Sequence, residues 1–141
     1  ESEGLAFIGD IDLTGFGPYY GDATSDLRQF QRSLQAVREL DARVWVTSHH
    51  RGVITGRAAF DEALTRFAAK IDERSERLLA YLADGPHSVA QLAARRILYP
   101  AGFELPYVDS AERRSVAQHL ELLVEDGRVR ALDDGRYALA G

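Results

Sequence analysis

Apolar positions along the first fifty residues form two short continuous runs that flank one helical stripe. The runs, residues 5–8 and 44–47, are typical of strands that are buried on both faces. Between them, apolar side chains recur at intervals of three and four, which predicts a helix that begins after Ser25-Asp26 and ends near Leu40. The order strand, helix, strand predicts a βαβ unit, in which the carboxyl ends of the two strands can converge.

The middle of the chain is dominated by one long helical pattern. Its apolar residues repeat near the helical period over residues 57–83, and the stop signal Asp84-Gly85-Pro86 follows. We expect this helix to join two domains. Ser88 and Gln91 then have the spacing of a capping box, which predicts the start of a short helix.

The last part of the chain has the pattern of a helix followed by a hairpin. The helix is predicted from about residue 109 to residue 125, with His119 on its surface. After it, Asp134-Gly135 predicts a two-residue hairpin turn between two short strands. The pattern of short helix, longer helix and hairpin is typical of a winged helix. The predicted domains are an α/β half-domain over residues 1–57, a linking helix over residues 58–83 and a winged helix over residues 84–141.

Composition narrows the class of protein. No apolar run approaches the roughly 18 residues of a membrane-spanning helix, so we expect a cytoplasmic protein without a membrane partner. Cysteine is absent, which excludes disulfides, thiolate nucleophiles and cysteine zinc sites. The net charge of -5 opposes non-specific binding to nucleic acid. Because methionine is absent as well, we expect the chain to be a fragment of a longer protein.

Polar side chains follow both predicted strands. Asp10 and Asp12 come after the first strand, and His49 and His50 come after the second. Since side chains alternate along a strand, one carboxylate and one imidazole can meet at the sheet edge, where they suit a zinc ion. In the alternative interpretation, the carboxylates serve the following turn and the histidines are solvated loop residues.

Several short motifs in this order resemble one family. They are Phe7-Ile8-Gly9-Asp10, Phe16-Gly17-Pro18, Ser25-Asp26 with Phe30 and Ser33-Leu34, and Val46-Thr47-Ser48-His49. With them the chain resembles the metallo-β-lactamase superfamily, specifically the second half of its αββα fold followed by the winged-helix extension of many of its hydrolases. The resemblance covers nearly the whole chain and implies an α/β fold class.

The resemblance also implies a metal site and a reaction. Asp10 would bridge two zinc ions and His49 would bind the second ion. Asp12 and His50 are the fallback ligands, because the family's last motif usually reads Gly-His-Gly and here two histidines are adjacent. The implied reaction is attack by a metal-bound hydroxide on an ester, thioester, lactam or phosphodiester of a small-molecule substrate.

The chain departs from the family in lacking most of the metal ligands. The family motif His-x-His-x-Asp-His and the middle histidine ligand are absent from it. A catalytic zinc site takes about three protein ligands plus water, so we expect the chain alone to be inactive. We expect its partner to be the missing N-terminal half or a second copy. Tyr19 and Tyr20, in the loop after Asp10, are candidates for substrate contact, with packing over the strand edge as the alternative.

Two other functions compete with this interpretation. Asp10 and Asp12 also resemble the Asp-x-Asp-x-Thr motif of haloacid-dehalogenase-like phosphatases, which use Mg²⁺, but the sole lysine, Lys70, lies within a predicted helix. The third function is a winged-helix module that binds nucleic acid through Arg113 and Arg114. Residues 84–141 contain seven arginines and nine acidic residues, which makes nucleic acid an unfavoured partner.

Overall fold

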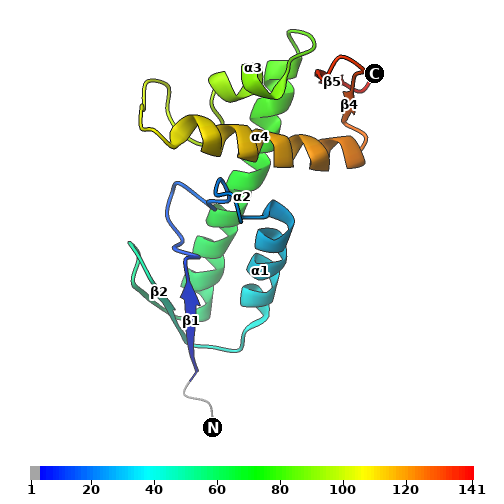
Figure 1. Cartoon of the computed structure of the whole chain (residues 1–141). Coiled ribbons are helices and arrows are strands. Elements are labelled where there is room, and N and C mark those ends of the chain that lie inside the picture. Colours follow the sequence, from blue (N-terminus) through cyan, green and yellow to red (C-terminus); the bar gives the residue numbers. More distant parts are fainter. Residues whose placement is uncertain (1–3) are drawn as a thin grey trace. The chain divides into compact units, whose positions relative to one another are not determined.

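The computed structural model describes residues 4–141 (Figure 1). In chain order, its elements are β1 (Leu5–Gly9), α1 (Leu27–Glu39), β2 (Val44–Thr47), β3 (Val53–Thr55), α2 (Arg57–Leu82), α3 (Val89–Ala94), α4 (Val108–Glu125), β4 (Val129–Ala131) and β5 (Tyr137–Leu139). Each helix in this part of the chain is too short or too polar to cross a membrane.

The elements form two compact units. Unit 1 contains the residues up to Pro18 together with Arg28–Ile71, and unit 2 contains Tyr19–Leu27 together with Asp72–Gly141. Helix α2 contributes its first part to unit 1 and its last part to unit 2. The domain boundaries expected at residues 57 and 83 stay a prediction.

Unit 1 contains the predicted βαβ arrangement. Strands β1 and β2 pair in parallel and are connected through α1, as the hydrophobic pattern predicts. The sequence analysis missed β3, which pairs antiparallel with β2 and consists of only three residues. The β-branched side chains of Val53-Ile54-Thr55 were the one signal for it.

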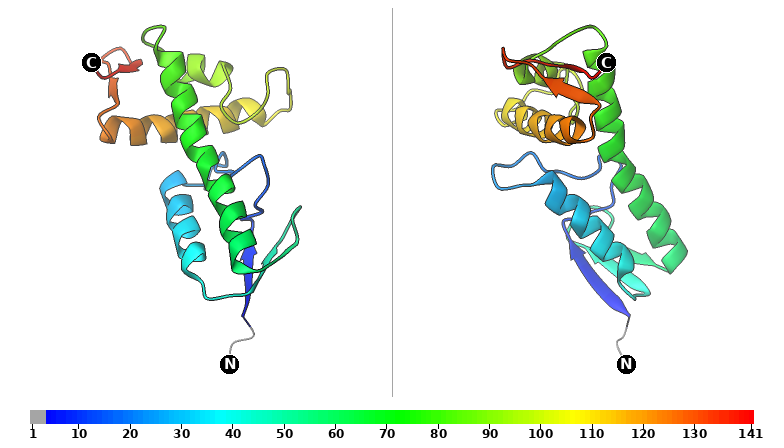
Figure 2. Two further views of the ribbon diagram at one scale, coloured as in Figure 1. Left: turned by 180° about the vertical axis from the view of Figure 1, so that it is seen from behind. Right: turned by 90° about the vertical axis from the view of Figure 1, so that its right-hand side faces the viewer.

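The helices of unit 1 cover one face of its sheet (Figure 2). Residues Ala6, Trp45 and Ile54 lie side by side in the pairing register, and Trp45 stacks on Phe60 of α2 with the ring centroids 4.1 Å apart. The Phe30 ring of α1 contacts Phe67 of α2. Burial of these rings fixes both helices against the sheet.

The other face of the sheet is exposed, so the prediction of strands buried on both faces was wrong. Leu5, Phe7 and Val53 project from this face and are 65%, 68% and 62% exposed. We call these three residues the open sheet face. The continuous apolar run of a strand indicates a covered surface, but no described element of unit 1 covers it.

Unit 2 is built around α4, α3 and the end of α2. Its core contains Leu78, Leu92, Val116, Leu120 and other apolar residues that are buried almost completely. The capping box is confirmed, because Ser88 accepts a hydrogen bond from the Gln91 N–H and the Gln91 side chain accepts one from the Ser88 N–H.

The hairpin β4–β5 forms as predicted, but its turn is longer than two residues. Leu132 and Arg136 still pair through the backbone, which leaves residues 133–135 as the turn. The Gly135 N–H donates to the Leu132 carbonyl oxygen and closes it. A turn of three residues is the next most common hairpin connection, so Asp134-Gly135 identified the hairpin and misjudged its length.

A buried polar network fastens the segment Tyr19–Leu27 to the helices of unit 2. Arg74 donates to the Tyr20 hydroxyl at 2.9 Å, and the same hydroxyl lies 2.6 Å from His119 Nε2. The other ring nitrogen of His119 is 2.8 Å from the Ser75 hydroxyl. Close approach here requires Gly21, since a Cβ at that position would lie 2.8 Å from the Ala111 Cβ.

His119 is therefore not a surface residue, and that expectation was wrong. It is fully buried on α4, with Tyr20 and Arg74 as neighbours. Burial and the Arg74 charge lower the pKa of His119 to about 3, so the ring is neutral at pH 7. Burial also raises the pKa of Tyr20, whose phenol therefore keeps its proton to donate to His119 Nε2.

Glu112 lies on α4, seven positions before His119. It is a buried carboxylate held by three consecutive backbone amides. It accepts hydrogen bonds from the N–H groups of Ile97, Leu98 and Tyr99 at 2.9, 3.0 and 2.8 Å. Those amides follow α3, so the carboxylate fixes the path of the chain from α3 toward α4. Three N–H donors compensate the cost of burying a carboxylate.

The buried histidine predicts a pH dependence of stability. Between pH 6.5 and about 3 the unfolded chain binds a proton at His119 that the folded chain does not bind. The free energy of unfolding should therefore fall by about 1.4 kcal/mol per pH unit as the pH decreases through this window. Urea denaturation followed by circular dichroism at pH 7 and pH 5 measures this slope. His119→Gln should flatten it, while His87→Gln should retain the wild-type slope, and equal slopes in all three proteins would contradict the assignment.

Removing the charge of Glu112 should destabilise unit 2. Glu112→Gln replaces one acceptor oxygen with a donor that faces the same three N–H groups. We expect a loss of about 2–4 kcal/mol in the free energy of unfolding. Glu121→Gln makes the same change at an exposed position of α4 and should change this free energy by less than about 0.5 kcal/mol. Denaturation midpoints that agree between the two variants would show that the amides do not need the carboxylate.

Candidate functional site

The two strand ends of unit 1 are joined directly beside the predicted ligands. The Ser48 N–H donates to the Gly9 carbonyl oxygen at 2.9 Å. Gly9 has a left-handed backbone conformation, with φ 57°, so the chain turns sharply at the end of β1. Asp10 follows Gly9 and His49 follows Ser48, which places the two side chains at the same edge of the sheet.

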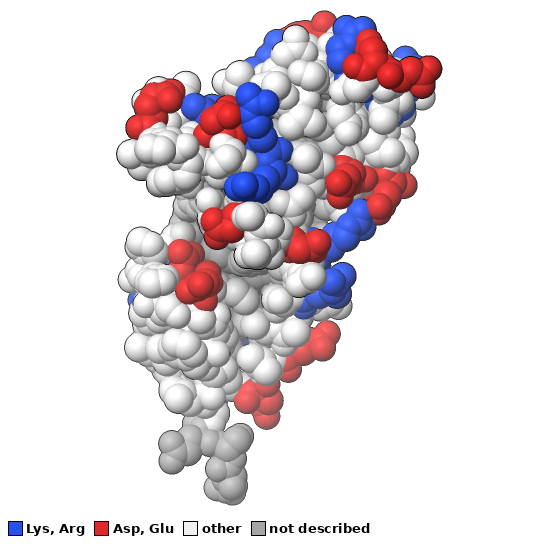
Figure 3. Space-filling model, in the orientation of Figure 1, with Lys and Arg blue, Asp and Glu red and all other residues white. Residues whose placement is uncertain are grey.

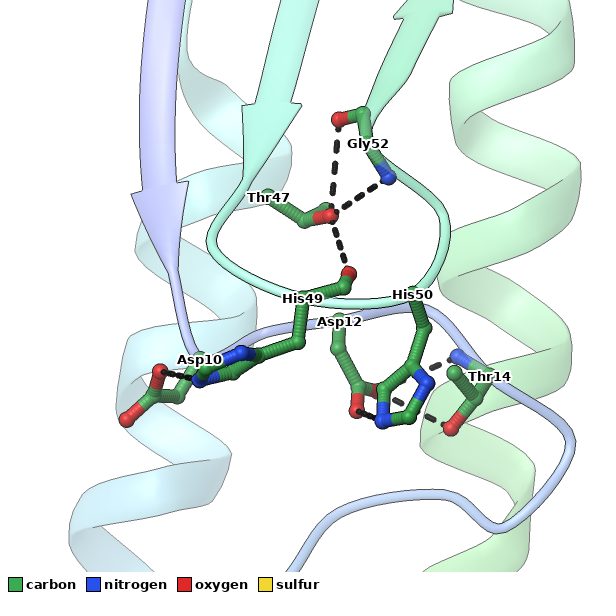
Figure 4. A network of polar contacts seen from close by, with 7 residues as sticks. All are labelled: Asp10, Asp12, Thr14, Thr47, His49, His50 and Gly52. Carbon is green, nitrogen blue, oxygen red and sulfur yellow. Dashed lines mark hydrogen bonds and ion pairs between the residues drawn. The ribbon is translucent and has the colours of Figure 1, made fainter.

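Asp10 lies beside His49, as the sequence predicted, and the fallback residues Asp12 and His50 form a second pair of carboxylate and imidazole (Figure 4). His49 Nε2 lies 3.4 Å from Asp10 Oδ1, and His50 Nε2 lies 3.9 Å from Asp12 Oδ2. The first pair is open to solvent, because the side chains of Asp10 and His49 are 86% and 65% exposed. Oxygen and imidazole nitrogen donors that are exposed and adjacent have the chemistry of zinc ligands.

Asp12 differs from Asp10 in the contacts it makes. Its Oδ1 accepts hydrogen bonds from the Thr14 N–H at 3.1 Å and from the Thr14 hydroxyl at 3.0 Å. The Asp12 side chain is only 22% exposed. Asp12 therefore stabilises the turn after β1. The alternative interpretation of the sequence proposed this role for both carboxylates. Asp10 makes no such contact among the hydrogen bonds found over residues 4–141.

The turn that carries the histidines is short and strained. The Thr47 N–H donates to the Gly52 carbonyl oxygen at 2.8 Å, and four residues lie between them. His50 adopts φ 57°, which is uncommon for a residue with a Cβ, and Gly52 adopts φ 72°. The sequence analysis missed Thr14 and Thr47 as residues of this site. Their hydroxyl groups, two positions from Asp12 and from His49 in the sequence, were the available signal.

No three imidazole or carboxylate side chains converge as a metal site within residues 4–141. The donors that do meet are the two pairs described above, so this part of the chain offers Asp10 and His49 as partial ligands. Their donor set fits a zinc ion whose remaining ligands come from elsewhere.

The predicted substrate contacts, Tyr19 and Tyr20, both lie in unit 2. Tyr20 has no exposed surface, and its hydroxyl is engaged by Arg74 and His119. Tyr19 forms a side-chain hydrogen bond with Tyr99. These contacts favour a packing role, and substrate contact by the two tyrosines stays a prediction.

Several arginines of unit 2 are paired with acidic or carbonyl oxygen atoms. Arg113 lies 2.7 Å from Asp109, Arg128 lies 2.9 Å from Glu76, and Arg114 donates to the Gly21 carbonyl oxygen. Figure 3 shows basic side chains beside acidic ones on the face it displays. Such pairing compensates positive charge that contacts to phosphate would use.

Comparison with solved structures identifies similar proteins. A metallo-β-lactamase family protein from Thermus thermophilus matches 97% of this chain with a TM-score of 0.68 and 31% sequence identity. A β-lactamase domain protein from Burkholderia ambifaria matches 81% of the chain with a TM-score of 0.60 and 23% identity. The chain resembles part of a metallo-β-lactamase family protein. It spans 42% of the first of these proteins and 33% of the second.

These structural neighbours support the metallo-β-lactamase superfamily that the sequence motifs suggested. The mixed α/β arrangement matches a metallo-β-lactamase-like fold over nearly the whole chain. No protein-family profile and no curated protein matches the chain.

The different contacts of the two aspartates predict different effects on stability. Asp12→Ala removes both hydrogen bonds to Thr14 and should lower the free energy of unfolding by about 1 kcal/mol. Asp10→Ala removes an exposed side chain and should leave that free energy within about 0.5 kcal/mol of the wild-type value. Chemical denaturation of the two variants makes the comparison. A larger loss in Asp10→Ala than in Asp12→Ala would reverse the roles assigned to them.

Proposed function

We propose that this chain carries part of the metal site of a zinc-dependent hydrolase of the metallo-β-lactamase superfamily. The observation that carries the proposal is the pair Asp10 and His49, which two converging strand ends present to solvent at 3.4 Å. The similarity to a metallo-β-lactamase family protein over 97% of the chain supports it. Asp12 and His50 are the fallback ligands.

Each residue of the pair has a distinct task in this proposal. The Asp10 carboxylate would bridge two zinc ions and compensate part of their charge, and the His49 imidazole would bind the second ion through nitrogen. Zinc, when bound, provides Lewis acidity and a water nucleophile at neutral pH. Asp12 keeps its hydrogen bonds to Thr14 and so stabilises the turn that follows Asp10. The substrate is a small molecule with an ester, thioester, lactam or phosphodiester bond.

A partner completes the site in this proposal. Two protein ligands are fewer than the three or so that a catalytic zinc ion takes, so we expect no hydrolysis by the chain alone. The open sheet face of Leu5, Phe7 and Val53 supports a partner, because large apolar side chains in one patch mark a packing surface. That partner is the first half of the αββα fold or, alternatively, a second copy of the chain.

The C-terminal helices and hairpin of unit 2 are a winged helix in this proposal. Helices α3 and α4 and the hairpin β4–β5 occur in the order that this domain requires. Because Arg113, Arg114 and Arg128 are paired, we assign the winged helix to packing or to a lid and not to binding nucleic acid. Binding to duplex DNA at physiological salt should be no tighter than about 10⁻⁴ M.

The proposal is tested in a protein that joins this chain to the first half of the fold. Metal analysis should find two zinc ions per molecule. Asp10→Ala and His49→Ala should each remove at least one metal equivalent and most of the hydrolytic activity, because each deletes a direct ligand. Asp12→Ala and His50→Ala are the matched variants one step along each strand end, and they should retain the metal.

Two outcomes would overturn this assignment. Loss of zinc in Asp12→Ala and His50→Ala, with retention in the other two variants, would make the fallback residues the ligands. Phosphatase activity that depends on Mg²⁺ and not on zinc would assign the chain to the phosphatase class instead.

A further inference from the structure

Thr47 ends β2 with its hydroxyl facing the turn that carries the two histidines. The residue is 5% exposed, so its hydroxyl is shielded from bulk water. It donates to the His49 carbonyl oxygen at 2.7 Å and accepts the Gly52 N–H at 2.9 Å (Figure 4). A single side chain therefore ties both ends of the turn together.

The direction of these hydrogen bonds follows from the number of protons available. The hydroxyl has one proton, and the Gly52 carbonyl oxygen is 3.4 Å from it and already accepts the Thr47 N–H at 2.8 Å. The His49 carbonyl oxygen is therefore the acceptor of the hydroxyl proton. This contact directs the carbonyl group of the peptide between His49 and His50 toward the Thr47 side chain.

This orientation of the peptide explains the conformation of His50. Its φ of 57° is unfavourable for a residue with a Cβ, so the turn needs a compensating interaction. The Thr47 hydroxyl supplies that interaction. With the turn in this form, Figure 4 shows the His49 ring directed at Asp10 and the His50 ring directed at Asp12.

We propose that Thr47 is a positioning residue that orients His49 and His50 toward the two carboxylates. It acts through the backbone and touches neither imidazole ring in the contacts found. Its effect on metal binding rests on the proposed function, whereas its effect on the orientation of the rings does not. Valine has the shape of threonine and favours strands, so Thr47→Val deletes the hydroxyl and should preserve the fold.

The test uses the 141-residue chain, uniformly isotope-labelled, and compares three variants. Thr47→Val removes the hydroxyl, Thr47→Ser retains it, and Thr55→Val makes the same change at an exposed position of β3. The readouts are nuclear Overhauser contacts between the His49 ring and Asp10, hydrogen exchange of the Gly52 amide, and a titration of the ring signals with Zn²⁺ alone.

In Thr47→Val we expect the ring contacts to disappear, the Gly52 amide to exchange roughly tenfold faster, and the Zn²⁺ affinity to fall roughly tenfold. Thr47→Ser and Thr55→Val should behave as the wild type does. Loss of the ring contacts in Thr47→Ser would show that the methyl group, and not the hydroxyl, is responsible, and would overturn the proposal.

The remaining outcomes separate this inference from the proposed function. Faster amide exchange in Thr47→Val with unchanged ring contacts would reduce Thr47 to a structural residue and overturn its positioning role. If wild-type chain and all variants leave the ring signals unchanged with Zn²⁺, the metal site fails for this chain, and the ring contacts alone then decide the role of Thr47.

Discussion

The parallel pairing of β1 with β2 is the constraint on which the candidate site depends. Parallel strands end at the same edge of a sheet, and here the Ser48 N–H continues the ladder to the Gly9 carbonyl oxygen one step beyond β2. The pairing requires a crossover, which α1 provides. Trp45 stacks on Phe60 of α2, and Phe30 of α1 contacts Phe67 of the same helix. Residues 39 positions apart in the sequence, Asp10 and His49, become neighbours because of this ladder.

The sequence predicted these features well because they depend on patterns that local physics enforces. Continuous apolar runs, a helical stripe and a capping box each follow from one periodicity or one hydrogen-bonding need, and β1, α1, β2 and α3 appear where the patterns place them. The pairing of one carboxylate with one imidazole was predictable from strand alternation. That both pairs form at once was not, because the irregular register near Gly9 and the left-handed His50 change the direction of successive side chains.

The burial of two polar residues of α4, which the sequence analysis did not predict, has one physical origin, because long-range partners decide it. His119 has a polar side chain on a helix, and its burial depends on Tyr20, which lies 99 positions away in the sequence. Glu112 can be buried because three backbone amides after α3 donate hydrogen bonds to its carboxylate. Both residues lie on the same face of α4 as Val116 and Leu123, so helical spacing contained a signal that residue polarity concealed.

The environment of Trp45 gives the two units different optical signals. Trp45 is the sole tryptophan of the chain, it is fully buried in unit 1, and its Nε1 is one of the buried side-chain atoms for which residues 4–141 provide no hydrogen-bond partner. An indole in a dry site emits at short wavelength, and its emission moves to longer wavelength when water reaches it. Fluorescence therefore reports the opening of unit 1 alone, while the helical ellipticity reports both units. The coincidence or separation of the two transitions measures how strongly the shared helix α2 couples the units.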